Sequence, residues 1–188
     1  GLGRQFPQER YRRHLLDDLF GDQAERRHGL RIDWRSELAP ASLDHDFDFS
    51  RHVINARAWW QPSRRRMVSG RVLAGTSGGE LPPQRVFALG GIGSVHGYSF
   101  KEAVGDRMLL LNAELRQDFG WGSSNTAGVV FLDAGRIFHP RPGSSDAWMH
   151  GVGVGIEFGR VGPRVEFGWR LDDIPSSLQV LFRLRPTF

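Results

Sequence analysis

The feature that most constrains the fold of this chain is a strict alternation of apolar and polar residues over long segments. From Leu178 to Phe188 one set of alternate positions is Leu, Val, Phe, Leu, Pro and Phe, and the other set carries two arginines. A period of two residues is that of a β-strand with one apolar and one polar face. The same alternation recurs in segments 30–38, 109–116, 151–158 and 164–171.

This pattern predicts an all-β fold of about eight antiparallel strands. We place them at residues 30–40, 50–61, 65–76, 106–119, 126–138, 147–159, 163–172 and 177–188. Several have ten residues or more, whereas strands in globular sheets average about five or six. A tilted strand needs about nine to eleven residues to cross a bilayer. The sequence therefore predicts a transmembrane antiparallel β-barrel.

The connections between these strands alternate in length, which assigns sides to the barrel. Short or modest turns at 61–65, 119–126 and 159–163 alternate with longer polar loops at 40–50, 76–106 and 138–147, and 172–177 is a short exception. Outer-membrane barrels have short periplasmic turns and longer extracellular loops. We therefore expect the C-terminus on the periplasmic side.

The two predicted faces differ in charge. The polar face carries both signs, as a water-filled lumen would, at Arg31, Asp33, Arg35, Glu37, Glu114, Arg116, Arg164 and Glu166. Trp34, Trp60, Trp148 and Trp169 fall on the apolar face, where aromatic residues of a membrane interface belong. A soluble β-barrel with its apolar face turned inward remains the alternative.

Composition excludes several other classes. The chain of 188 residues has a net charge of +4, but its arginines are scattered among acids, which argues against a nucleic-acid partner. The absence of cysteine excludes disulfide and thiol chemistry. Residues 1–29 differ from the rest and are expected to form a linker or a short amphipathic helix on the membrane surface.

Three motifs suggest chemistry without supporting it. Gly75–Gly79 matches the G-x-S-x-G pattern, but no helix can follow promptly, as a nucleophile elbow requires. Gly90–Gly97 lacks the third glycine of a dinucleotide fingerprint. Asp44–Phe49 offers three carboxylates for a divalent cation, although a solvated acidic loop is the favoured interpretation. We predict no enzyme activity, no cofactor and no metal site.

The most distinctive segment is "GGIGSVHGYSF" at Gly90–Phe100, inside a long loop at 77–105. It resembles the sixth extracellular loop of the outer-membrane protein insertase family, the BamA/TamA-like surface-antigen superfamily, which also contains the two-partner-secretion transporters. That loop carries a Val-Arg-Gly-Tyr/Phe tetrad, matched here by Val95, His96, Gly97 and Tyr98. Two later strands are similar too, "LNAELRQDF" (Leu111–Phe119) and "GVVFLDAGRIF" (Gly128–Phe138). The closing "LFRLRPTF", with Phe182 and the final Phe188, resembles the C-terminal signal of outer-membrane barrels.

The resemblance implies that the loop folds back into the lumen, where the tetrad arginine pairs with the wall at Glu114 and at Asp133, in the motif of Phe131. In this chain His96 stands at the arginine position. Histidine is mostly neutral at pH 7, so we expect a weaker or pH-dependent pair, and a stronger one in His96→Arg. Gly97 would let the loop backbone lie close to the wall.

The resemblance also implies a role in outer-membrane protein assembly or polypeptide translocation in a Gram-negative outer membrane. Partners would be membrane lipid and unfolded outer-membrane or secreted polypeptides. The family barrel has sixteen strands, so residues 30–188 are expected to be its C-terminal half, to be completed by a second copy as a homo-oligomer, or to close as a small plugged barrel. The runner-up function is a membrane-anchor barrel, dimeric or not, of a patatin-like lipase or peptidase.

Overall fold

The fold is a single curved antiparallel sheet with a loop packed on its concave side. The computed structural model describes residues 27–39, 48–120, 126–159, 163–172 and 178–184. Within this part nine strands form one sheet, which confirms the predicted all-β class. The strands are β1 His28–Ala39, β2 Phe49–Ser63, β3 Arg66–Gly79, β4 Phe87–Leu89, β5 Ala103–Asp118, β6 Thr126–Pro140, β7 Met149–Phe158, β8 Arg164–Arg170 and β9 Gln179–Arg183.

The eight predicted strands correspond to β1–β3 and β5–β9, with ends displaced by a few residues. The ninth strand, β4, was not predicted because it is only three residues long and lies within the loop. Among the described residues, no helix has the length and apolar character needed to span a membrane. The N-terminal segment expected at residues 1–29 lies almost entirely outside the described residues, as do Phe188 and most of Asp44–Phe49.

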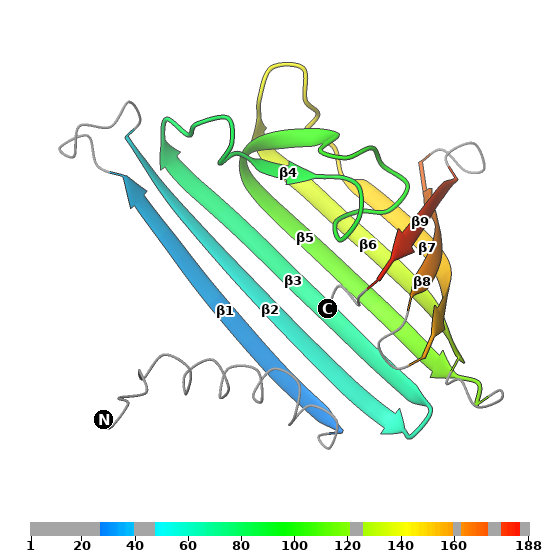
Figure 1. Cartoon of the computed structure of the whole chain (residues 1–188). Helices are drawn as coiled ribbons and strands as arrows, with labels where there is room; N and C mark the ends of the chain where they lie inside the picture. The colour runs from blue at the N-terminus through cyan, green and yellow to red at the C-terminus, as the bar shows by residue number, and fades with distance from the viewer. Residues whose placement is uncertain (1–26, 40–47, 121–125, 160–162, 173–177, 185–188) are drawn as a thin grey trace, which may run out of the picture.

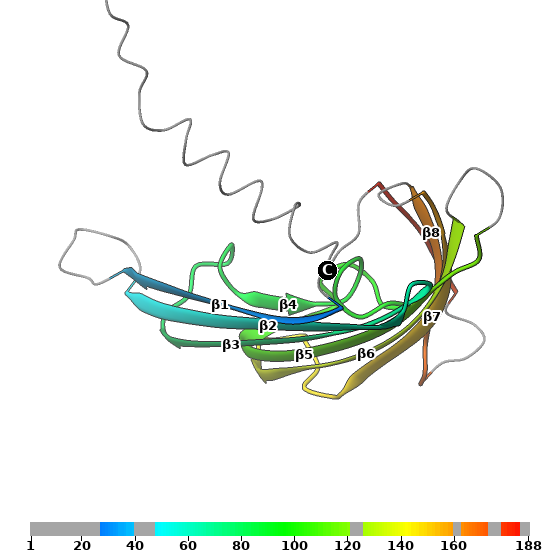
Figure 2. The same ribbon diagram turned by 90° about the horizontal axis from the view of Figure 1, so that it is seen from below.

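The sheet is open in the described part of the chain. Strand order is β1-β2-β3-β5-β6-β7-β8-β9, with β4 paired only to β5, so β1 and β9 are the two edges. Figures 1 and 2 show a trough whose hollow side carries β4 and the loop around it. The small plugged barrel is therefore not the observed arrangement, because its edge strands would have to pair with each other.

Strand register divides the sheet into apolar and polar rows. One row of mutually paired positions crosses seven strands and is wholly apolar: Leu30, Ala58, Gly70, Ala113, Leu132, Val152 and Trp169. The neighbouring row points to the other face: Arg31, Arg57, Arg71, Asn112, Asp133, Gly151 and Arg170. The sequence alternation is thus kept in register across these seven strands.

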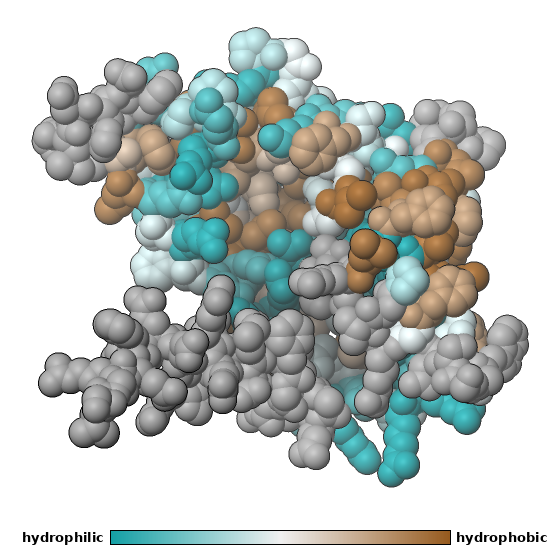
Figure 3. All heavy atoms as spheres, in the orientation of Figure 1, coloured by the Kyte–Doolittle hydropathy of each residue, from teal (hydrophilic) through white to brown (hydrophobic). Residues whose placement is uncertain are grey.

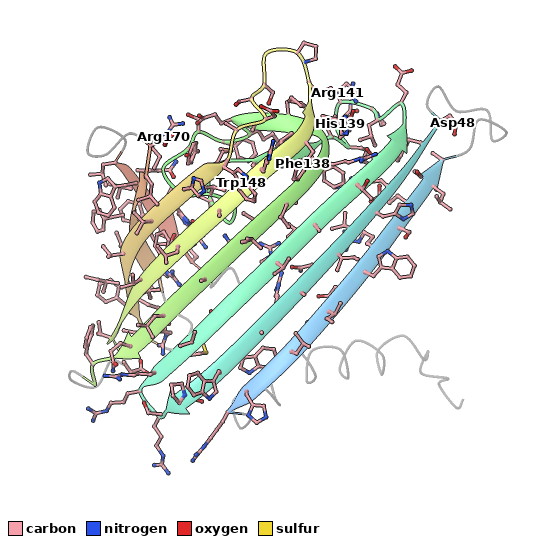
Figure 4. All side chains as sticks on the ribbon, turned by 180° about the vertical axis from the view of Figure 1, so that it is seen from behind. Asp48, Phe138, His139, Arg141, Trp148 and Arg170 are labelled. Atoms are coloured by element: carbon pink, nitrogen blue, oxygen red, sulfur yellow. The ribbon has the colours of Figure 1, made fainter. Side chains whose placement is uncertain are left out.

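The apolar rows cover the outer, convex face, seen from behind in Figure 4. Leu132 and Leu30 are 56% and 66% exposed there. A soluble barrel would bury these side chains, so the outward position of the apolar rows contradicts the soluble alternative. We call these outward apolar residues of β1–β3 and β5–β9 the apolar belt.

The concave face is more varied. In Figure 3, which has the orientation of Figure 1, hydrophilic residues gather over the middle of the sheet, whereas hydrophobic ones gather at the side where the sheet curls round at β7–β9. Under the loop an apolar cluster is buried: Phe87, Leu89, Val95, Tyr98, Ala103, Met108, Leu110, Ile137 and Met149. The loop is therefore held to the wall by an apolar core as well as by charges.

Candidate functional site

The tetrad residues lie at the tip of the loop, pressed against the concave wall. Val95 is fully buried, and His96 and Tyr98 are each 3% exposed. The turn that presents them is fixed from within, because the main-chain N–H of Gly91 donates to the carbonyl of Val95 and the N–H of Gly90 donates to Oγ of Ser94. The loop thus brings His96 to the wall as a preformed turn.

Asp133 on β6 holds one side of His96. Its Oδ2 accepts a hydrogen bond from the His96 main-chain N–H at 3.1 Å and contacts Nδ1 of the ring at 2.5 Å. Its Oδ1 accepts from Nδ2 of Asn112 at 2.7 Å, and the same amide donates to the carbonyl of Ser94. The Asp133 carboxylate therefore binds the loop directly at His96, and it also binds the loop indirectly through Asn112, whose amide donates to Ser94.

The other side of the imidazole faces β8 and β9. Nη2 of Arg183 lies 2.6 Å from Nε2 of His96, while Nε of Arg183 lies 2.8 Å from Oε2 of Glu166. The same Oε2 is 3.4 Å from Nε2 of the histidine. Because a guanidinium only donates, the Arg183 contact requires Nε2 to accept, which is the neutral imidazole with its proton on Nδ1 facing Asp133.

The expected partner Glu114 is placed differently. Its Oε2 accepts from Nη2 of Arg164 at 2.8 Å, and Nε of Arg164 lies 2.7 Å from Oε1 of Glu166. Of the two carboxylates that the resemblance implied, Asp133 contacts His96 in the described structure, and Glu166 rather than Glu114 is the second. The sequence identified Glu166 only as one of the lumen-facing charges.

We call His96, Asp133, Glu166, Arg183, Arg164 and Glu114 the ion cluster. All six are buried, and Glu166 has no exposed surface at all. Three carboxylates face two guanidiniums and one imidazole, so the cluster is neutral when His96 is protonated. The ring of Phe131 lies under the imidazole, with 4.2 Å between ring centroids.

His96 belongs to the loop, outside the spanning strands, and its protonation responds to this environment. Burial lowers the pKa of His96, but the hydrogen bonds and charges of Asp133 and Glu166 outweigh it and raise that pKa above its ordinary value. On protonation Nε2 would exchange its hydrogen bond from Arg183 for one to Glu166.

Glycines allow the close approach of loop and wall. Gly97 has φ of +85°, and a Cβ there would lie 2.2 Å from the backbone nitrogen of Arg170. On the wall, a Cβ at Gly151 would lie 2.5 Å from the carbonyl oxygen of His96. Backbone atoms cannot move aside as a flexible side chain can. A side chain at either position would therefore collide with its neighbour, so both positions require glycine.

Tyr98 and the last strand complete the attachment. The Tyr98 hydroxyl donates to Asp172 at 3.0 Å and accepts from the main-chain N–H of His150, while the Arg170 guanidinium covers its ring. From β9, Gln179 accepts from the N–H of Gly97 at 3.1 Å and donates to the carbonyl of Tyr98. Phe182 is 75% exposed on the opposite face of β9 and takes no part in this contact.

The other motifs singled out in the sequence do not gather into a site. Ser77 lies within β3, and its hydroxyl donates to the carbonyl of Asp106 at 2.8 Å. The described residues contain no group of three or more histidines, cysteines or carboxylates able to hold a metal ion.

Comparison with known proteins identifies the family. The family profile described as the Omp85 superfamily domain matches residues 25–174. No curated protein matches the chain.

Solved structures similar to this chain include BamA and CdiB. BamA from Haemophilus ducreyi lacking POTRA domains 1-3 has a TM-score of 0.65 and 13% sequence identity, and the match covers 86% of this chain and 38% of that one. CdiB from Escherichia coli is similar with a TM-score of 0.57 and 22% identity, covering 72% and 27%. This chain thus spans well under half the length of either structure. Because the profile match covers most of its residues, the chain belongs to the Omp85 superfamily.

Proposed function

We propose that this chain forms part of the wall of an outer-membrane β-barrel that assembles outer-membrane proteins or translocates polypeptides, with its C-terminus in the periplasm. The observation that carries this proposal is the division of the sheet into a convex apolar belt and a concave polar face. A sheet of that kind is stable with lipid on one side and an aqueous lumen on the other.

The loop and the ion cluster have a definite part in this proposal: they lock the loop against the lumen wall. The lock joins β6 through Asp133, β8 through Glu166 and β9 through Arg183 and Gln179. A buried charge that loses its partner is strongly unfavourable, so displacement of the loop, which would break these pairs, is opposed and the docked loop has one well-defined position. The lock therefore sets which part of the lumen is filled and which is open to a polypeptide.

The presence of His96 at the arginine position of the tetrad is an argument for the membrane-anchor alternative. Arg183 weakens that argument, because it supplies a guanidinium from another strand to Glu166, one of the two carboxylates beside His96. We therefore favour the assembly or translocation role, because a loop held firmly in the lumen matters for the passage of a polypeptide but is not needed for membrane anchoring.

The proposed function can be tested with the full chain in phospholipid vesicles. An unfolded outer-membrane β-barrel protein is added, and its rate of folding is measured by gel mobility without heating. We expect faster folding than in empty vesicles, and a smaller acceleration with Asp133→Ala. A chain that inserts into the bilayer but leaves both client folding and polypeptide passage unchanged would contradict the proposal and favour the anchor.

A further inference from the structure

The β2–β3 hairpin carries three consecutive arginines, Arg64 and Arg65 in its turn and Arg66 at the start of β3, which we together call the arginine turn. It lies at the end of the sheet opposite β4 (Figure 1). All three residues are exposed. The three arginines take no part in the lock between the loop and the wall. A hairpin of this kind also forms without arginine, so neither docking of the loop nor formation of the turn explains why arginines are found here.

Within the described residues, no acidic side chain neutralises the charge of the arginine turn. Nε of Arg66 donates to the neutral amide oxygen of Gln117 at 2.6 Å. The nearest acid along the paired strand, Asp118, meets the turn only through its main-chain N–H, which donates to the carbonyl of Arg65. Its carboxylate is already bound by Arg116 at 3.0 Å. In the described structure no carboxylate pairs with any of the three guanidiniums, although like charges on successive residues repel one another.

The arginine turn borders the apolar belt directly. Val68 and Trp60 are paired across β2 and β3 and are 39% and 57% exposed on the convex face. Arg66 precedes Val68 by two residues, which is about 7 Å along a strand. Arginine side chains reach from such a position to the polar surface of a bilayer, and tryptophan prefers the same depth. With the apolar belt in a bilayer, the three guanidiniums would therefore lie at the level of the lipid headgroups.

We propose that the arginine turn binds the phosphate headgroups of anionic phospholipids in the leaflet next to the short turns. The guanidinium fork matches phosphate oxygens two at a time, and the belt beside it accommodates the acyl chains. Its position at the edge of the belt favours a lipid over an acidic protein. This inference rests on the proposed function, which places the belt in a bilayer.

The test measures lipid selectivity with the full chain in phosphatidylcholine bilayers. Spin-labelled phosphatidylglycerol or spin-labelled phosphatidylcholine is added, and the motionally restricted fraction is measured by electron paramagnetic resonance at low salt. We expect phosphatidylglycerol to associate more strongly by about threefold or more, with the preference falling as sodium chloride screens the charges. Arg64→Gln/Arg65→Gln/Arg66→Gln should bring it close to unity, and the triple lysine variant should retain most of it.

A matched control lies at the other border of the belt, where Arg107 and Arg136 occupy β5 and β6. Arg107→Gln/Arg136→Gln should leave most of the preference in place, and an equal loss there would overturn the assignment to the turn. Displacement of the lipid by inorganic phosphate beyond the effect of chloride at equal ionic strength would indicate a free-anion site instead. Binding of polyglutamate that depends on the three arginines, without lipid preference, would indicate an acidic polypeptide partner.

The outcomes separate the two proposals. If the chain inserts and the two labelled lipids associate equally, the arginine turn is not a lipid site, while the proposed function stands. If the chain does not insert into either bilayer, the placement of the belt in a membrane is wrong and both proposals fall.

Discussion

Arg183 on β9 and His96 in the loop lie 2.6 Å apart although 87 residues separate them in the sequence. Arg183 also binds Glu166, so the guanidinium joins the loop, the last strand and β8 at one point. The loop of this chain therefore brings an imidazole to the wall, and the wall supplies the permanent cation. The docking of the loop on the wall and the position of β9 at the edge of the sheet therefore depend on the same contacts.

Removal of this cation should loosen both the loop and β9. In Arg183→Gln we expect the free energy of unfolding to fall by about 2 kcal/mol, because a charged hydrogen bond is lost at a buried carboxylate. Urea unfolding in detergent gives the stability, and limited proteolysis within residues 80–102 gives the docking. Arg35→Gln, at an exposed position of β1, is the control and should change neither.

A double-mutant cycle then isolates the contact itself. His96→Ala and Arg183→Gln should be coupled by about 1 kcal/mol or more if the two side chains act together. Additive effects of the two substitutions would contradict the arrangement described for the ion cluster.

The substitution His96→Arg should destabilise the docked loop, which reverses the expectation from sequence alone. A second guanidinium at this place would meet Arg183, and like charges in a buried site repel strongly. Adding Arg183→Gln should recover stability, since one guanidinium would then serve both Asp133 and Glu166. Protease cleavage of the loop in the single and double variants measures this, and a single variant that is more protected than the wild type would refute it.

These residues show what the sequence could and could not predict. Alternation gave the strands and faces because a two-residue period is a local property of the chain, kept by β1–β3 and β5–β8 along their length. It placed Glu114 on the inner face and Asp133 on one face with Phe131, but could not choose between Glu114 and Glu166, because that depends on how far each strand is displaced along its neighbour. Arg183 was missed for the same reason, and β4 because three residues have no detectable period.

Gly97→Ala should displace the loop tip from the wall. The new Cβ would collide with the backbone of Arg170, in addition to the cost of a positive φ. Gly143→Ala is the matched control, because Gly143 has a φ of +83° with nothing within 4 Å. Both variants bear the backbone strain and only the first bears the collision. Hydrogen exchange of the loop should rise in Gly97→Ala alone, and equal effects would show that the contact is not needed.

The docked loop should depend on pH through His96. Its pKa is raised in the folded protein, so this stabilisation is fully present below the ordinary value of about 6.5 and is lost as the pH rises through the folded pKa. The measurement is the difference in free energy of unfolding between the wild type and His96→Gln from about pH 5 to about pH 9. We expect this difference to shrink as the pH rises, and a difference that grows would contradict the assignment.

The orientation of the sheet is the central claim, and a spin-label scan along β5 in a lipid bilayer tests it most directly. The chain has no cysteine, so single cysteines can be introduced and labelled one at a time from Leu109 to Leu115. Labels at Leu109, Leu111, Ala113 and Leu115 should collide often with oxygen dissolved in the lipid, and those at Leu110, Asn112 and Glu114 should not. High oxygen accessibility at the second set, or no alternation between the two sets, would contradict the account.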